Sequence, residues 1–234
     1  MSIAGTIRAL WINQLKDIVR NREVLILFFV YPLVAIVMDS AIPEQYAQGN
    51  MFIAMFGTMH IVFTPIVAAT ALIAEEREKH TLKVLMMSNV KPFEYLLSVG
   101  GFIFACTMIT GSSFIFFGGY EGIDIAKVLV YMAVGCVCSM VIGGAIGMSS
   151  RSMTAANATA VPLGLILSFG PMLSSFNQNI RRASRLLYSQ QISDLMNQPQ
   201  IEDGALERTV VIIVNLVVIV GVFRFFAGRQ RLEE

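Results

Sequence analysis

The chain has 234 residues, of which 56% are hydrophobic and 14% are charged, and its mean hydropathy is +0.68. A soluble globular protein of this length cannot bury so much apolar surface, so we expect lipid to surround most of the chain. The net charge of +1 argues against a nucleic-acid partner. The composition therefore predicts an all-α polytopic membrane protein.

Six apolar stretches approach the length of about 20 residues that a helix needs to cross a bilayer. They lie at 24–42, 51–74, 93–118, 125–148, 157–173 and 209–227. With both chain ends in the cytoplasm, 12 of the 17 lysines and arginines fall in inner segments and five in outer ones. We therefore predict a single transmembrane domain over 1–234, in the plasma membrane, with both termini cytoplasmic.

The segment 1–22 precedes the first span and is amphipathic. Ile3, Ile7, Leu10 and Trp11 follow helical spacing, and basic residues occupy the other side. This pattern predicts an interfacial helix along the inner leaflet, with Trp11 at the depth of the headgroups. A disordered basic tail is the alternative.

The segment 174–206 is too polar to span the membrane, yet it is patterned. Apolar residues that include Ile180 and Leu187 form a stripe opposite Arg181, Arg182 and Arg185. We predict two short amphipathic, re-entrant helices that dip into the outer interface. A soluble, flexible loop is the alternative.

The densest charge cluster of the chain lies at 75–90, between the second and third spans. Leu82, Leu85, Met86 and Val90 share one face if this segment is helical, and the charged residues occupy the remainder. A short amphipathic helix held at the end of two spans offers a soluble partner a place to bind. The alternative is an ordinary solvated turn.

Chemistry-bearing motifs are absent from the sequence. There is no G-x-x-x-x-G-K-[ST], no H-E-x-x-H and no G-x-S-x-G, and the three cysteines lack metal-ligand spacing. We therefore expect no catalytic residue, metal site or cofactor in this chain. Among the polar groups inside the spans, His60 and Asn215 are candidates either for hydrogen-bonded helix packing or for a transport pathway.

Small residues recur at four-residue spacing in the fourth span, at Gly135, Ser139, Gly143 and Gly147. Such a stripe allows another helix to approach closely. The sequence leaves open whether that helix belongs to the same chain or to a second subunit.

The stretch 71–90 resembles the segment that follows the second span of ABC type-2 exporter permeases. Those proteins show Glu-x-Glu-x-Gly-Thr, then a leucine-rich turn and a short polar break. Glu76, Glu78 and Thr81 match this pattern, Leu82 and Leu85 fit the turn, and 88–90 form the break. His80 replaces the usual glycine and Asn89 replaces the common proline.

This resemblance implies that 75–90 is a cytoplasmic coupling helix, which docks into a groove of a separate ATPase subunit that binds ATP and Mg. The coupling residues would be Glu75, Glu76, Arg77, Glu78, Lys79, Thr81, Leu82, Leu85 and Met86. The acidic residues and the basic Arg77, Lys79 and Lys83 would give charge complementarity to the ATPase, and Leu82, Leu85 and Met86 would hold the helix to the membrane domain. ATP-driven closure of two ATPases would then rock the spans. Such permeases work as dimers with a second copy or a paralogue, and 177–196 would cap the pathway between the halves.

Compact members of the family export lantibiotics, other antimicrobial peptides or phenol-soluble modulins, and others export sodium or drugs. Apolar spans with few ionisable groups favour an amphipathic or hydrophobic cargo, and we expect a peptide. The alternatives are a drug or sodium exporter permease, a stand-alone secondary transporter or channel, and a non-transporting membrane scaffold. A stand-alone transporter would need ionisable residues at mid-membrane.

Overall fold

The computed structural model describes residues 11, 22–41, 51–79, 92–199 and 205–230. These residues are almost entirely helical, and no strand occurs among them. The predicted interfacial helix at 1–22 lies outside this set, apart from Trp11 and the backbone of Arg22. The ring of Trp11 packs edge-on against Phe102, with 6.1 Å between the ring centroids.

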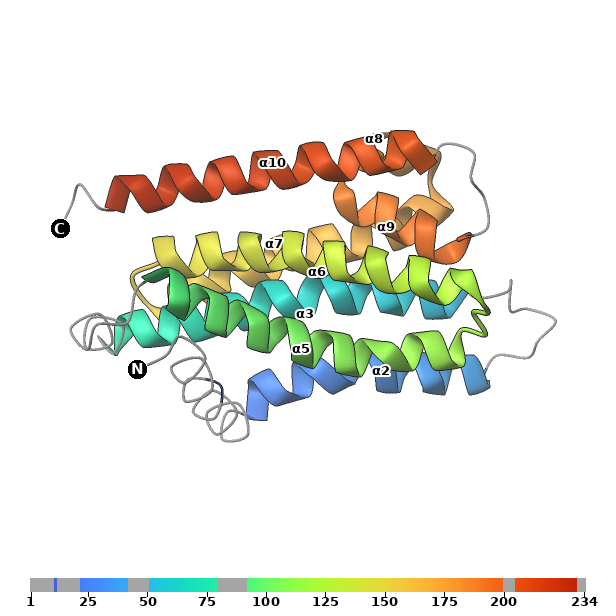
Figure 1. Ribbon diagram of the computed structural model, residues 1–234, viewed down its shortest axis with the longest axis horizontal. Coiled ribbons are helices and arrows are strands. Elements are labelled where there is room, and N and C mark those ends of the chain that lie inside the picture. The colour runs from blue at the N-terminus through green and yellow to red at the C-terminus, as the bar shows by residue number, and fades with distance from the viewer. Residues whose placement is uncertain (1–10, 12–21, 42–50, 80–91, 200–204, 231–234) are drawn as a thin grey trace.

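Six long helices form the body of the molecule, and each is long and apolar enough to cross a membrane. Figure 1 shows them lying along one common direction, with consecutive long helices running opposite ways. The prediction of a polytopic all-α protein is therefore confirmed. The helices are α2 (Arg22–Ala41), α3 (Met51–Glu78), α5 (Pro92–Phe117), α6 (Ile123–Ser149), α7 (Met153–Phe176) and α10 (Ala205–Gln230).

Helix α3 is the centre of the bundle. It packs against α2, α5, α6 and α7 and against the short helix α9 (Tyr188–Asn197). Every residue from 57 to 74 is buried. A helix that is apolar on all sides is stable only when other apolar elements surround it, and α3 meets that condition.

The small-residue stripe of α6 lies against α3. A Cβ atom added at Gly143 would stand 2.3 Å from the carbonyl oxygen of Ile66, and one added at Gly147 would stand 3.0 Å from that of Thr70. The close approach also lets the Thr70 hydroxyl donate to the Gly143 carbonyl at 3.0 Å. The stripe therefore serves packing within this chain, which resolves the alternative that the sequence left open.

Two short helices, α8 (Gln178–Ser184) and α9, lie between α7 and α10. We call this end of the bundle the α9 end, and the opposite end, where α3 finishes, the junction end (Figure 1). Helix α9 packs against α3, α6, α7 and α10. Its buried Tyr188 hydroxyl lies 2.9 Å from that of Ser139, and the carbonyl of Met196, in its last turn, accepts a hydrogen bond from Tyr120 at 2.8 Å.

Helix α10 lies along one side of the bundle and packs on α6 and α9 (Figure 1). Only 6% of its apolar stretch, Leu206–Arg224, is buried inside the molecule. Many of its valine, leucine and isoleucine side chains are exposed, as several are on α2. This exposed apolar surface fits a lipid environment.

Candidate functional site

The charged cluster after the second span begins as part of α3. The sequence pattern predicts a separate short helix from Glu75, whereas the structure continues α3 without a break to Glu78. Glutamate and arginine are good helix formers, so the end of the apolar stretch does not end the helix. Lys79 follows in a turn, and Thr81, Leu82, Leu85 and Met86 lie outside the described residues.

Two charged side chains at the end of α3 bind the connection between α6 and α7. Arg77 donates to the carbonyl of Met148, one of the last four carbonyls of α6, which have no partner within their own helix. Glu78 accepts from the backbone N–H of Met153, the first residue of α7, at 2.7 Å. The positive charge of Arg77 lies at the C-terminus of α6 and the negative charge of Glu78 at the N-terminus of α7, and the helix dipoles favour both arrangements.

The same turn of α3 also reaches α5. The carboxylate of Glu76 interacts electrostatically with the hydroxyl of Tyr95, which is buried near the start of α5. Glu75 pairs with Lys79 along its own helix, at the i,i+4 spacing. We call Glu76, Arg77 and Glu78 the α3 junction, because these three consecutive residues contact α5, α6 and α7.

His60 lies at the middle of α3 and is fully buried. Its Nε2 lies 3.2 Å from the carbonyl oxygen of Thr107 and 3.0 Å from the hydroxyl of Thr110, both on α5. Its Nδ1 lies 3.4 Å from the hydroxyl of Thr64, which itself donates to the Leu27 carbonyl on α2 at 3.0 Å. These contacts join three helices and favour the packing role for His60.

Asn215 joins α10 to the turn between α8 and α9. Its side-chain nitrogen donates to the carbonyls of Leu186 and Val211, each at 2.8 Å. This geometry also favours packing. Of the outer residues predicted from sequence, Arg181, Arg182 and Arg185 are exposed on α8 and its C-cap, whereas Ile180 and Leu187 are half-buried.

Some residues that organise this structure were not singled out from sequence as binding groups. Tyr188 and Ser139 join α9 to α6. The backbone groups of Met148 and Met153 form hydrogen bonds with Arg77 and Glu78 of the α3 junction. A tyrosine in an otherwise polar segment was the one available signal for Tyr188. Within the described ranges, His, Cys, Asp and Glu side chains do not gather in threes as a metal site would require.

Comparison with known families decides what kind of protein this architecture belongs to. The family model described as ABC-2 family transporter protein matches residues 22–227, which is most of the chain. The chain belongs to the ABC-2 family. No curated protein and no solved structure gives a significant match.

Membership of the ABC-2 family makes this chain a multi-pass membrane permease of an ABC exporter, and it implies an ATPase partner. The six helices that could span a membrane are the part of the structure that fits this role. The α3 junction stands at the end of the central helix and joins it to α6 and α7.

Proposed function

We propose that this ABC-2 permease moves an amphipathic or hydrophobic cargo, a peptide, out of the cell, and that a separate cytoplasmic ATPase subunit docks on 75–90 to drive it. The chain itself then hydrolyses no ATP. A second permease, identical or paralogous, completes the pathway, and both termini lie in the cytoplasm of a cell whose plasma membrane holds the complex.

The α3 junction is the observation that carries this proposal. The chain after Glu78 continues from the end of α3. This helix end contacts α5, α6 and α7 through the side chains of Glu76, Arg77 and Glu78. A push on a docked segment therefore reaches four spans at once, including α3. Rigid-body rocking of packed helices is an established way in which such a push becomes a conformational change.

The distribution of carboxylates supports an amphipathic cargo over an ion. In the described long helices, aspartates and glutamates lie near the helix ends, as Asp39, Asp124 and Glu207 do. A sodium pathway would need oxygen ligands with charge at mid-membrane. A drug exporter remains the second candidate, because apolar spans suit an apolar drug equally well.

The docking step is tested by combining Lys83→Glu with Leu85→Asp, which puts two negative charges into the segment 75–90 and leaves the α3 junction intact. We expect the ATPase to co-purify with the wild-type chain and to be lost from this variant by about tenfold or more. Lys127→Glu makes the same charge reversal at the α9 end and should retain the ATPase. Retention of both binding and stimulated ATP hydrolysis by the docking variant would show that the partner binds elsewhere.

Transmission is tested separately by replacing Arg77 and Glu78 with alanine. This variant keeps the rest of the segment 75–90, so it should retain ATPase binding in part, but export of a fluorescent amphipathic peptide per bound ATPase should fall more than ATP hydrolysis does. Equal loss of both activities would contradict a transmitting role. Export of a drug or of sodium without peptide export would assign the cargo to the second candidate class.

A further inference from the structure

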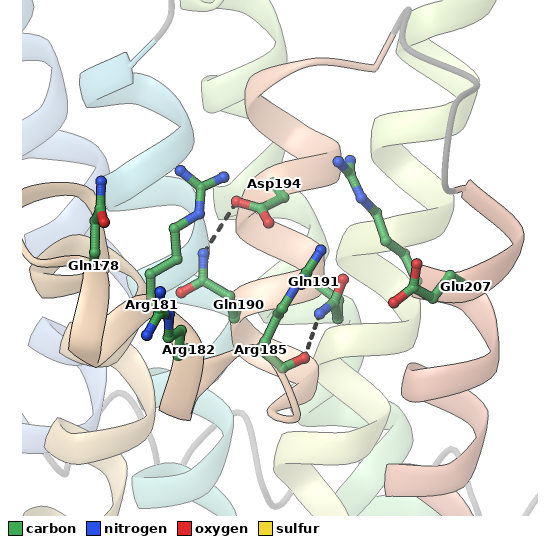
Figure 2. A pocket seen from close by; sticks show the side chains of 9 residues that line it. Gln178, Arg181, Arg182, Arg185, Gln190, Gln191, Asp194 and Glu207 are labelled. Atoms are coloured by element: carbon green, nitrogen blue, oxygen red, sulfur yellow. Dashed lines mark hydrogen bonds between the residues drawn. The ribbon is translucent and has the colours of Figure 1, made fainter.

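A polar cavity of about 390 Å³ opens at the α9 end between α8, α9 and the start of α10 (Figure 2). Every residue that lines it is charged or a glutamine. The charged residues are four arginines and two carboxylates: Arg181, Arg182, Arg185, Arg208, Asp194 and Glu207. The lining thus carries two more positive than negative charges.

The arginines of this cavity are not neutralised by the carboxylates beside them. Within the described ranges, no salt bridge joins any of the four to an acidic side chain. Arg181, Arg182 and Arg185 are exposed and Arg208 is half-buried. A cavity lined by four such guanidinium groups, with only two carboxylates beside them, is suited to an anionic ligand.

The cavity wall is held in place by its own hydrogen bonds. Gln190 donates to Asp194 at 3.0 Å and accepts from Ser184 at 3.1 Å, while Gln191 donates to the Arg185 carbonyl at the end of α8. Figure 2 shows the Gln190–Asp194 and Gln191–Arg185 hydrogen bonds as dashed lines. Gln190 and Gln191 are both at least 96% buried. The arginines are therefore carried by a fixed framework.

Large apolar side chains are exposed on the elements that form this cavity and at the end of α7, which precedes α8. Phe176 ends α7, Leu186 lies between α8 and α9, and Leu206 opens α10, and their exposed fractions are 72%, 73% and 82%. The cavity extends from Glu207 and Arg208, at the start of α10, to Arg185, whose neighbour Leu186 binds Asn215 further along α10. The start of a spanning helix lies near the lipid headgroups. A ligand with an anionic group and an apolar chain could contact both the arginines of the cavity and these exposed apolar side chains.

We propose that this cavity binds the phosphate of an anionic phospholipid from the leaflet on the α9 side. Guanidinium groups match phosphate oxygens in fork geometry, and the cavity volume lies within the usual range for small-ligand sites. The acyl chains would lie along the exposed apolar side chains of α7 and α10. The proposal goes beyond cargo export and holds whichever leaflet faces the cytoplasm.

The test uses the full-length chain in a neutral detergent, with added phosphatidylglycerol or phosphatidylcholine of identical acyl chains. Native mass spectrometry counts bound lipid, and thermal unfolding reports the stabilisation. We expect phosphatidylglycerol to bind and to raise the Tm, and phosphatidylcholine to do so about tenfold more weakly. Inorganic phosphate, which lacks the chains, should give a smaller shift at equal concentration. Equal shifts with both lipids would overturn the proposal.

The matched variants place the effect in the cavity. Arg181→Gln with Arg208→Gln should abolish the preference for phosphatidylglycerol, whereas Arg151→Gln with Arg224→Gln removes two charges elsewhere and should keep it. Arg182→Gln alone provides a milder change on exposed α8 if the double variant does not fold, and should weaken binding several-fold. A preference that survives every cavity variant, or an acidic peptide that shifts the Tm where phosphatidylglycerol does not, would overturn the assignment.

Discussion

The Glu78 carboxylate and the backbone N–H of Met153 form a hydrogen bond of 2.7 Å between the last turn of α3 and the first turn of α7. Ser152 accepts from Ala155 N–H at 3.2 Å in the same turn, so two of the unpaired donors that open α7 are satisfied together. The start of α7 is therefore built from two segments that lie 75 residues apart.

Replacement of Glu78 by alanine should lower the free energy of unfolding by about 1 kcal/mol, because an anionic partner is removed from a helix N-terminus. Thermal unfolding in detergent measures the change. Glu78→Gln should recover part of the loss, since the amide oxygen still accepts. Glu121→Ala removes an exposed carboxylate at the α9 end and serves as the control. An equal loss of stability in Glu121→Ala would contradict a specific stabilising role for the Glu78–Met153 hydrogen bond.

Gly143→Ala should destabilise the bundle by about 1–3 kcal/mol, because the added methyl group would stand 2.3 Å from the Ile66 carbonyl oxygen and force α6 away from α3. Gly144→Ala is the matched control on the same helix, since its nearest neighbour lies 3.6 Å away. Comparison of the two Tm values checks the prediction. Equal values would mean that α6 does not lie this close to α3.

His60→Leu should destabilise the protein by about 0.5–1.5 kcal/mol, because it removes the ring nitrogens that Thr64 and Thr110 face, although both hydroxyls keep a backbone carbonyl as acceptor. His60→Gln keeps hydrogen-bonding groups at the site and should lie between the leucine variant and the wild type. Export per folded molecule should remain close to wild type in both. A complete loss of export with an unchanged Tm would instead place His60 on the transport pathway.

The Ser139–Tyr188 pair should show a coupling free energy of about 0.5–1.5 kcal/mol in a double-mutant cycle made from Ser139→Ala and Tyr188→Phe. The two hydroxyls lie 2.9 Å apart and both residues are buried. Four thermal or chemical unfolding curves complete the cycle. Additive effects would show that α9 is held to α6 by apolar packing alone.

Alkaline pH should weaken the attachment of Tyr120 to α9. Burial raises the pKa of this phenol to about 12 from its ordinary value of 10.0, so the folded chain keeps the proton that the unfolded chain releases. The contribution of Tyr120 to stability is therefore complete below about pH 10 and is lost as the pH rises through about 12. The Tm of Tyr120→Phe should fall less than that of the wild type over this window. Equal slopes would contradict the prediction.

The six long helices could be predicted from sequence because a bilayer demands long apolar stretches and little else resembles them. The ends of these helices were harder to predict. Helix α7 begins at Met153 rather than 157, since Ser152 caps it and the polar residues of its first turn do not shorten a helix even where they shorten an apolar stretch. Helix α3 likewise continues through Glu75 to Glu78.

Partners distant in the chain could not be predicted from the pattern. The charges of Arg77 and Glu78 indicated a binding surface, but their backbone partners lie 71 and 75 residues further on, and a backbone group leaves no mark in a sequence. Likewise, the stripe that includes Gly143 indicated a close helix contact without naming α3 as the helix. Both depend on which helices become neighbours.

The contrast between α3 and α10 has a consequence for how this sequence can change over evolutionary time. Side chains of α3 meet five other helices, so a change in the size of one of them disturbs several contacts. Along α10, where most side chains face outward, valine, leucine and isoleucine can replace one another at little cost. Substitutions should therefore accumulate quickly in the last span and slowly in the second, although the two have similarly apolar compositions.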